Sequence, residues 1–149
     1  MPPPTATATT TAAKRANTII NDVVIQVATA NGSGSQSSNN ILLRSIFQMG
    51  IPVSGKNLFP SNIQGLPTWF TIRVNRDGWT ARRKEVDFLV AMNPDSVADD
   101  LKDLRAGGVL VLNSELKSHL NRGDIHAHMV PFNDLVAQAE TRIRSGIIA

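Results

Sequence analysis

The sequence predicts an α/β domain in which helices cover both faces of a mostly parallel sheet. Three observations favour this class. The chain has 149 residues, of which 42% are hydrophobic and 5% aromatic, which suits one compact domain with a single core. Short runs of Val, Ile and Leu, typical of buried strands, alternate with segments of helical periodicity. Such alternation is typical of strand–helix units in a parallel sheet.

The first strand–helix unit follows a segment with no foldable pattern. Residues 1–18 hold three consecutive prolines and a Thr/Ala alternation, so we expect a disordered leader before a single domain over residues 19–149. The apolar run over residues 23–28 predicts a central strand that is covered on both faces. Residues 41–49 carry apolar side chains at helical spacing, and Gly50 ends this predicted helix.

The middle of the chain predicts two strands joined by a long ordered loop. Residues 53–67 are rich in Gly, Pro, Ser and Asn, which indicates a short strand followed by the loop. Three apolar side chains of this region should pack against the domain: Phe59, Ile63 and Trp69. Residues 68–75 are β-branched and aromatic and predict a strand, and the Asp77-Gly78 pair after it is typical of a hairpin turn.

The last third predicts further strands and helices. They are a buried strand over residues 86–92, a helix that starts at 93–96 and ends at Gly107-Gly108, a buried strand over 109–112, an edge strand over 126–130 and a helix over 131–144. The last helix is amphipathic, with one apolar face formed by Leu135, Val136, Ala139 and Ile143.

Composition excludes several classes of protein and site. The chain has no cysteine, which excludes a disulfide scaffold, a cysteine nucleophile, a zinc finger and a ligated iron–sulfur cluster within this chain. No apolar run is long enough to span a membrane or to serve as a signal peptide, so we expect a cytoplasmic protein without a membrane partner.

Catalytic, metal and nucleic-acid motifs are also missing. No serine lies in G-x-S-x-G, so we expect no catalytic residue in this chain. His126 and His128 share one face of a predicted strand but lack a third ligand, so we expect no metal site. The basic run over residues 82–84 lacks interleaved aromatics and is interpreted as a solvated turn, without a nucleic-acid partner.

Positive charge is concentrated in the middle of the chain. The formal net charge is +3, yet residues 44–84 hold seven basic residues against Asp77 alone, a net of +6. Residues 85–149 hold ten acidic and six basic residues, a net of −4. The middle third is therefore a candidate anion-facing region.

Two polar segments are candidate ligand sites. The turn over residues 31–36 lies between the first strand and the first helix, where backbone N–H groups and a helix N-terminus favour a phosphate or carboxylate. Ser37 stands where the dinucleotide fingerprint needs its third glycine, and a tight turn with an N-cap serine is the alternative interpretation. The second segment could line an anionic pocket through Lys56, Asn57, Ser61, Asn62 and Gln64, or could form a rigid interface loop.

The order of these segments resembles a known family. VVIQVATANGSGSQSSNNILLRSIFQMGIPVSGKNLFPSNIQGLPTWFTIRV, followed by VDFLVAMNP and GGVLVLNS, resembles the γ domain of the 2-oxoacid:ferredoxin oxidoreductases. The likeness is closest to the branch in which γ is fused to the N-terminus of the α subunit, as in 2-oxoglutarate:ferredoxin oxidoreductase. It covers roughly residues 21–131, and GKNLFPSNIQGLPTW is its most specific part.

The resemblance implies a Rossmann-like domain that packs beside an active site held by other domains. Such complexes oxidatively decarboxylate a 2-oxoacid with thiamine diphosphate and Mg²⁺, pass electrons through iron–sulfur clusters to ferredoxin, and form an acyl-coenzyme A. The implied partners are α and β subunits, with ferredoxin as acceptor. The residues expected to bind coenzyme A or another anion are Asn31, Gly32, Ser33, Gly34, Ser35, Gln36, Lys56, Asn57 and Arg73.

This sequence departs from the family pattern in two places. Hydroxyl side chains at Ser33, Ser35 and Ser37 replace flexible positions of the G-x-G-G-x-G turn found in many members. The chain also ends at Ala149, where the family usually continues through one more helix, so we expect a separate or shortened γ subunit or a piece of a longer α chain.

Three functions follow as hypotheses. The first is a γ component that helps to bind coenzyme A and shapes the active site without supplying a catalytic group. The second is a structural or assembly subunit whose polar loop is an interface. The third is a free-standing nucleotide-binding protein. The +6 middle stretch favours the first over the second, because coenzyme A carries several phosphate charges.

Overall fold

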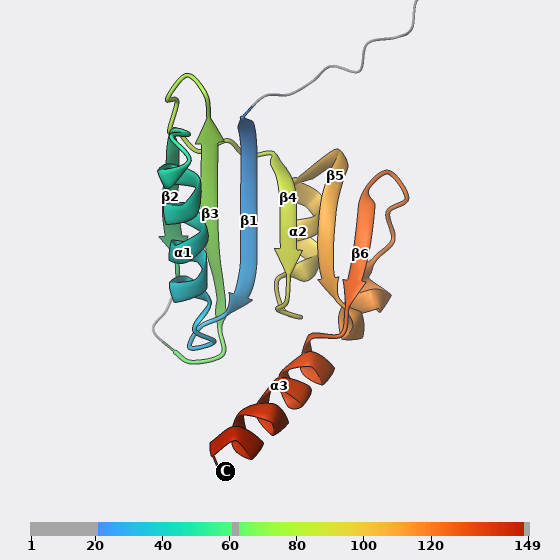
Figure 1. The fold of residues 1–149 in the computed structure, drawn as a ribbon. Helices are drawn as coiled ribbons and strands as arrows, with labels where there is room; N and C mark the ends of the chain where they lie inside the picture. The colour runs from blue at the N-terminus through green and yellow to red at the C-terminus, as the bar shows by residue number, and fades with distance from the viewer. Residues whose placement is uncertain (1–20, 61–62, 148–149) are drawn as a thin grey trace, which may run out of the picture.

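The computed structural model describes residues 21–60 and 63–147, so the predicted leader lies outside the described residues. Six strands form one sheet in the order β2-β3-β1-β4-β5-β6 (Figure 1). The elements are β1 (Asp22–Ala30), α1 (Ser35–Gln48), β2 (Val53–Leu58), β3 (Pro67–Asn75), β4 (Val86–Ala91), α2 (Val97–Asp103), β5 (Leu104–Asn113), the 3₁₀ helix η1 (Ser114–His119), β6 (His126–Val130) and α3 (Phe132–Ile147).

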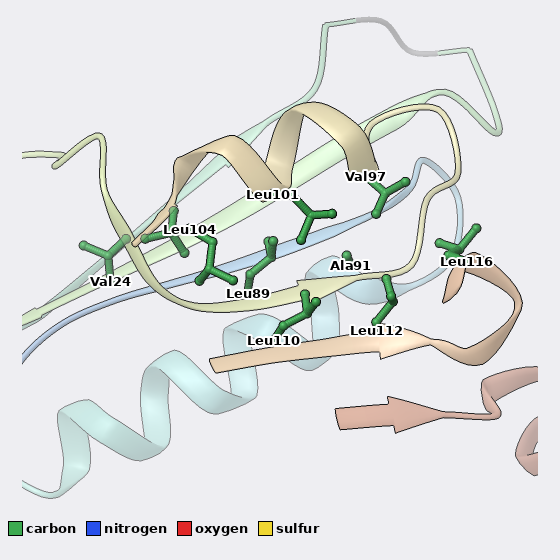
Figure 2. Packing of buried hydrophobic residues seen from close by; sticks show 10 residues of the cluster. Val24, Leu89, Ala91, Val97, Leu101, Leu104, Leu110, Leu112 and Leu116 are labelled. Atoms are coloured by element: carbon green, nitrogen blue, oxygen red, sulfur yellow. The ribbon is translucent and has the colours of Figure 1, made fainter. Parts of the chain in front are cut away.

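The sheet has a parallel half and an antiparallel half. β1, β4, β5 and β6 pair in parallel, whereas β3 is antiparallel to both of its neighbours, β1 and β2. α1 lies on one face and α2 on the other (Figures 1 and 2). The predicted α/β class, with a mostly parallel sheet and helices on both faces, is confirmed.

The main core fills the space between α2 and the parallel half of the sheet. Figure 2 shows these side chains directed toward one another from β1, β4, β5, α2 and η1. The buried cluster comprises Val24, Val86, Leu89, Ala91, Val97, Leu101, Leu104, Leu110, Leu112 and Leu116. Burial of a Val or Leu side chain stabilises the fold by about 1.5–3 kcal/mol. The packing of this layer therefore holds the parallel strands in place, and with them the edge of the sheet at which they end.

A smaller core joins α1 to the antiparallel half of the sheet. Phe70, Ile72 and Val74 of β3 are buried there, and Leu43 and Ile46 of α1 pack against them. The predicted helix is confirmed, and it begins at Ser35, earlier than its first apolar residues. Its other large apolar side chains, Ile41, Leu42 and Phe47, are exposed, and so is Met49 directly after the helix.

The predicted hairpin after β3 is wrong. Gly78 adopts a φ of +81°, and its N–H donates to the carbonyl of Asn75 at 3.1 Å, so the chain does turn here. β1, however, lies between β3 and β4, and those two strands are not neighbours. An Asp-Gly pair specifies a local reversal, whereas strand order depends on the pairing of β1 with both strands.

The predicted end of the second helix at Gly107-Gly108 is also wrong. α2 ends at Asp103, and both glycines lie inside β5. Gly107 has a φ of +72°, and a Cβ atom on Gly108 would lie 2.7 Å from Cδ1 of Leu104 and 2.9 Å from the carbonyl oxygen of Arg105. The pair therefore serves the irregular pairing between β4 and β5, where glycine accommodates a bulge.

Other expectations about burial are corrected. Phe59 and Ile63 were expected to pack down but are 51% and 65% exposed. Along β1, Val24 and Ala28 are buried on the α2 side, while Val23, Ile25 and Val27 on the other side are partly exposed, so the strand is not equally covered on both faces. The last predicted helix is confirmed as α3, but it extends away from the sheet (Figure 1).

Candidate functional site

A polar pocket of about 340 Å³ lies where β1 ends and α1 begins. Its lining residues come from the β1–α1 turn, the first turn of α1, and the neighbouring parts of β2 and β3: Ala30, Asn31, Gly32, Gly34, Ser35, Gln36, Ser37, Asn57 and Thr68. This edge of the sheet carries the carboxyl ends of the parallel strands, the usual ligand-binding edge of such sheets.

The shape of the turn depends on two glycines. Gly32 and Gly34 have φ values of +86° and +76°, which glycine adopts far more cheaply than any residue with a Cβ atom. The N–H of Ser33 donates to the carbonyl of Ala30, and the N–H of Ser37 donates to that of Gly34, both at 3.2 Å. These bonds close the turn directly onto the first turn of α1.

Backbone and side-chain hydrogen bonds of Asn31 hold the turn against the β2–β3 loop. The N–H of Asn31 donates to the carbonyl of Leu66 at 2.8 Å, and the carbonyl of Asn31 accepts from the N–H of Gly65 at 3.0 Å. Nδ2 of Asn31 donates to the carbonyl of Ile63 at 3.2 Å. The loop between β2 and β3 is therefore fastened to the β1–α1 turn, although its own apolar side chains are exposed.

The N-terminus of α1 faces this pocket without an acidic group or a side-chain cap of its own. Its N-cap residue is Gly34, and no cap hydrogen bond from a side chain is found among the described residues. The first turn contains no Asp or Glu. The N–H groups at such a helix end carry about half a positive charge, which favours an anionic ligand.

The hydroxyl and amide side chains around the pocket are suited to hydrogen bonding. Oγ1 of Thr29 and Oγ of Ser35 lie 2.7 Å apart. Across the pocket, Oγ1 of Thr68 donates to the carbonyl of Leu58 at 3.1 Å and lies 3.5 Å from Oδ1 of Asn57. Asn57 thus reaches the pocket from β2, as the pairing of Asn57 with Phe70 on the α1 side of the sheet requires.

Lys56 does not line the same pocket. Adjacent residues of a strand point to different faces of the sheet, so Lys56 and Asn57 project to different faces. Lys56 pairs with Thr71 of β3. Lys56 is exposed. Ser61 and Asn62 lie outside the described residues, and Gln64 lies beside the turn, with its Cγ 3.2 Å from where a Cβ atom on Gly32 would be.

Arg73 lies toward the opposite end of β3, away from the pocket. It is buried, and its guanidinium lies 2.5 Å from Oδ1 of Asp22 and donates to the carbonyl of Val74 at 2.6 Å. The hydrogen bond from Arg73, together with one from Asn75, holds the pKa of Asp22 below its usual value. The structure therefore brings seven of the nine predicted residues to one turn and its neighbouring strand, and places Lys56 and Arg73 elsewhere.

Three of the seven basic residues of the middle stretch, Arg73, Arg76 and Arg83, lie in ion pairs at that far end. Arg83 lies 2.5 Å from Oδ2 of Asp87, and Arg105, from outside that stretch, lies 2.7 Å from Oδ1 of the same carboxylate. Oδ2 of Asp87 also accepts the N–H of Val24 at 2.7 Å. The +6 count in the sequence therefore does not describe a free positive surface around the turn.

No sequence pattern predicted a second polar cluster, which lies on the opposite face of the sheet. Oδ1 of the buried Asp100 in α2 accepts from Nε1 of Trp69 at 2.7 Å and from Nε2 of Gln26 at 3.3 Å. Burial raises the pKa of Asp100, and hydrogen bonds from Ser96 and Trp69 act in the other direction. Gln26 and Trp69 lie 74 and 31 positions from Asp100 in the chain, so only the strand order brings the three residues together.

Within residues 21–60 and 63–147, no group of three or more His, Cys, Asp or Glu side chains is placed to hold a metal ion. His126 and His128 lie on one face of β6, as their spacing predicts, and both are exposed. No helix in this part of the chain is both long and apolar enough to cross a membrane.

Comparison with known proteins identifies relatives of this chain. Residues 24–149 match the family described as pyruvate ferredoxin/flavodoxin oxidoreductase. Subunit alpha of 2-oxoacid:ferredoxin oxidoreductase 2 from Aeropyrum pernix is 29% identical over 97 residues. That match covers 65% of this chain but 15% of the relative, so the chain corresponds to a small part of that subunit.

Solved structures with the same fold include two separate subunits and one large chain. Subunit PORC of pyruvate oxidoreductase from Thermotoga maritima has a TM-score of 0.66 at 15% identity, covering 80% of this chain and 67% of its own. The gamma subunit of a keto/oxoacid ferredoxin oxidoreductase from Geobacter sulfurreducens has a TM-score of 0.58 at 18% identity, covering 72% and 60%.

The large chain is 2-oxoglutarate:ferredoxin oxidoreductase from Magnetococcus marinus, solved with 2-oxoglutarate, coenzyme A and succinyl-CoA bound. Its TM-score is 0.69 at 18% identity, and the likeness covers 82% of this chain and 22% of that one. The family match spans most of this chain, and the structural likeness adds the fold of a gamma subunit. The chain therefore belongs to the pyruvate ferredoxin/flavodoxin oxidoreductase family.

Proposed function

We propose that this chain is the γ component of a thiamine-dependent 2-oxoacid:ferredoxin oxidoreductase and that its β1–α1 turn binds an anionic group of coenzyme A. The observation that carries the proposal is the N-terminus of α1. It opens into a polar pocket and has neither an acidic first turn nor a side-chain cap among the described residues. A phosphate group would supply the missing negative charge and accept the N–H donors.

The proposed ligand site consists of the turn and one residue of β2. Its members are Asn31, Gly32, Ser33, Gly34, Ser35, Gln36 and Asn57. Gly32 and Gly34 let the backbone approach the ligand, while Asn57 and Gln36 offer amide groups at the pocket wall. Lys56 and Arg73 are left out of the proposed site, because both lie away from this pocket. A role for either residue in ligand binding stays a prediction.

The chemistry of the complex belongs to other domains in this proposal. Thiamine diphosphate with Mg²⁺ would supply decarboxylation, and iron–sulfur clusters would carry electrons to ferredoxin. The chain has no cysteine to ligate a cluster, and its described part shows no group of ligands for a metal ion. Its own residues would bind and orient coenzyme A beside an active site that the α and β partners hold.

A structural or assembly subunit is the second candidate. The observation in its favour is the outer surface of α1, which exposes Ile41 and Phe47, together with the exposed Met49 directly after the helix. Exposed apolar side chains of this size are common at interfaces between subunits. In that case the glycine turn would be a structural bend, and ligand affinity would not depend on it.

Two turn variants separate these functions. A Cβ atom at Gly34 meets no described atom within 4 Å, so Gly34→Val acts mainly through its φ of +76°, which costs about 1–3 kcal/mol for a β-branched residue. We expect Gly34→Val to weaken coenzyme A binding to the assembled complex about tenfold or more, and Ser35→Ala to have less effect.

The measurement is a calorimetric titration of coenzyme A into the assembled complex, with folding of each variant checked by circular dichroism. Wild-type affinity in a folded Gly34→Val complex would show that the turn does not hold the ligand. The assembly function would then be the better explanation of this chain.

A further inference from the structure

A second cavity, of about 370 Å³, lies on the other side of the β1–α1 turn. It is bounded by the end of β1, the start of α1 and Met92, which directly follows β4. We call it the crevice pocket, and we call the polar cavity of about 340 Å³ the turn pocket. Ala30 and Ser35 line both cavities, so the two pockets adjoin each other where α1 begins.

The topology of the sheet places the crevice pocket at a position typical of ligand sites. β1 and β4 are adjacent and parallel, yet α1 and α2, which follow them, lie on opposite faces of the sheet (Figures 1 and 2). Where two neighbouring strands send their helices to opposite faces, a crevice forms outside the strand ends. The N–H of Met92 donates to the carbonyl of Ala28 at 3.0 Å, so the two strands stay paired up to this crevice.

One buried amide that lines the crevice pocket lacks a hydrogen-bond partner. Asn39 of α1 is 7% exposed, and its Nδ2 atom is buried and donates to no acceptor among the described residues. Another buried amide at the same edge is satisfied, because Nδ2 of Asn93 donates to the carbonyl of Thr29 at 3.4 Å. The unpaired donor is thus particular to Asn39.

An unpaired buried donor destabilises the fold that contains it. A leucine at position 39 would occupy a similar volume without this cost, and it would pack beside Val27 in the same pocket. Asn39 is therefore poorly suited to packing alone. It is suited to a ligand that brings an acceptor oxygen into the crevice pocket.

The other walls of the crevice pocket indicate an uncharged ligand group. Val27 and Met92 provide apolar surface, while Ser33 and Ser38 add hydroxyl groups. None of the described residues that line this pocket is charged or aromatic. A nucleotide base would lack an aromatic or arginine side chain on which to stack. A flexible chain of methylene and amide groups matches apolar walls with a few hydrogen-bonding side chains.

We propose that the crevice pocket binds the uncharged, amide-bearing arm of coenzyme A, and that one carbonyl oxygen of this arm accepts a hydrogen bond from Asn39. This inference rests on the proposed function, in which the turn pocket takes a phosphate group of the same molecule. The ligand crosses the turn beside Ala30 and Ser35, which line both pockets. Each pocket thus recognises a different half of one ligand.

Two ligands separate the two halves in a calorimetric titration of the assembled complex. Coenzyme A carries both halves, whereas adenosine 3′,5′-bisphosphate carries phosphate groups but no amide arm. We expect Asn39→Leu to weaken binding of coenzyme A about tenfold, the effect of losing one buried hydrogen bond. The affinity for adenosine bisphosphate should stay unchanged, because that ligand offers no carbonyl to Asn39.

Asn40→Leu is the matched control. It makes the same substitution at the next residue of α1, which lies about 100° further around the helix and lines neither pocket. We expect this variant to keep wild-type affinity for both ligands. A loss of coenzyme A affinity in Asn40→Leu equal to that in Asn39→Leu would show an effect of helix polarity and would overturn the assignment to Asn39.

Urea denaturation of the chain gives a second readout, which a structural role of Asn39 would move in the other direction. Asn39→Leu removes an unpaired buried donor, so we expect a higher urea midpoint together with the weaker binding of coenzyme A. Asn39→Asp keeps the size of the side chain but replaces the donor by an acceptor. It should weaken binding of coenzyme A at least as much, without the gain in stability.

The results distinguish failure of this inference from failure of the proposed function. Unchanged coenzyme A affinity in Asn39→Leu, or an equal loss for both ligands with a lower urea midpoint, would overturn the role of the crevice pocket. Gly34→Val should weaken binding of both ligands, because both place a phosphate at the turn. If Gly34→Val weakened neither, the proposed function itself would be wrong.

Discussion

α1 and α2 begin at the same edge of the sheet, after two neighbouring parallel strands, yet their N-termini differ in charge. The first turn of α2 carries Asp99 and Asp100, which supply negative charge near its N-terminus. α1 has no acidic residue in its first turn and begins after Gly34, with serines and Gln36 around the pocket. Equivalent places in the topology therefore offer different electrostatic potentials.

This difference explains why only one of the two ends is a candidate anion site. At α2, the carboxylates of the chain itself already interact with the helix end, and a bound anion would be repelled by them. At α1, the corresponding charge is absent and has to come from a ligand or from solvent. The two helix ends have the same place in the topology, and a few side chains determine which of them is the candidate anion site.

The most direct way to remove the difference is to give α1 an acidic first turn. We expect Gln36→Glu to weaken coenzyme A binding by roughly ten- to a hundredfold, because a carboxylate would face the ligand's phosphate. The same change should stabilise the chain by about 0.3–1 kcal/mol, since it complements the helix dipole. Calorimetric titration of the assembled complex and urea denaturation of the chain measure the two effects.

Gln36→Glu is expected to weaken coenzyme A binding and to stabilise the chain. A misfolded variant would instead lose both affinity and stability, so the two cases can be told apart. Asp99→Asn at α2 is the control and should leave coenzyme A affinity unchanged, since that helix has no ligand in this proposal. Unchanged affinity in Gln36→Glu would place the anion elsewhere.

A second pair of variants compares the two faces of β2. Asn57 lines the turn pocket, whereas Lys56 projects to the opposite face. We expect Asn57→Ala to weaken coenzyme A binding about three- to tenfold, which corresponds to one neutral hydrogen bond of about 0.5–1.5 kcal/mol. Lys56→Ala should change it by less. If Lys56→Ala had the larger effect on titration, the anion would lie on the α2 side of the sheet.

The smallest expected effect concerns the acidic end of α2 itself. Burial raises the pKa of Asp100, so the folded protein holds this proton more tightly than the unfolded chain. The stability linked to this proton is fully present below the ordinary pKa of the carboxyl and is lost as pH rises through the folded value. Asp100→Asn keeps an acceptor for Trp69 and removes this pH dependence.

Urea denaturation of the two proteins between about pH 4 and pH 8 provides the measurement. The stability of Asp100→Asn relative to the wild type should rise with pH and then level off. Asp99→Asn removes a neighbouring charge that also raises the pKa of Asp100, so it should reproduce only a small part of this rise. A difference that stayed constant over the whole range would mean that burial of Asp100 does not affect its titration.

Local patterns predicted most of the elements. The apolar runs at β1, β4 and β5 predicted their strands, because a buried strand needs such residues whatever its neighbours are. The Gly-Ser turn before α1 was placed correctly for the same reason, since Gly32 and Gly34 suit positive φ angles in any fold. These features depend on residues that are consecutive in the sequence.

Errors arose where a residue serves a distant contact. Gly107 and Gly108 look like the end of a helix, but Gly107 adopts a φ of +72° inside β5, and a Cβ atom on Gly108 would lie 3.2 Å from the carbonyl oxygen of Asp87 in β4. Gly55 in β2 has a comparable role, because a Cβ atom there would lie 2.8 Å from Cδ2 of Leu43 in α1. Neither contact can be inferred from the neighbouring sequence.

The sequence by itself thus determined the alternation of strands and helices, the glycine turn and the absence of cysteine, all of which depend on residue type and spacing. Tertiary structure alone decided that Asn57 joins the turn while Lys56 and Arg73 do not, and that Trp69 and Gln26 meet Asp100. The physical reason is strand pairing. Register and order assign each side chain to a face and an end of the sheet, and they are set by contacts between residues far apart in the chain.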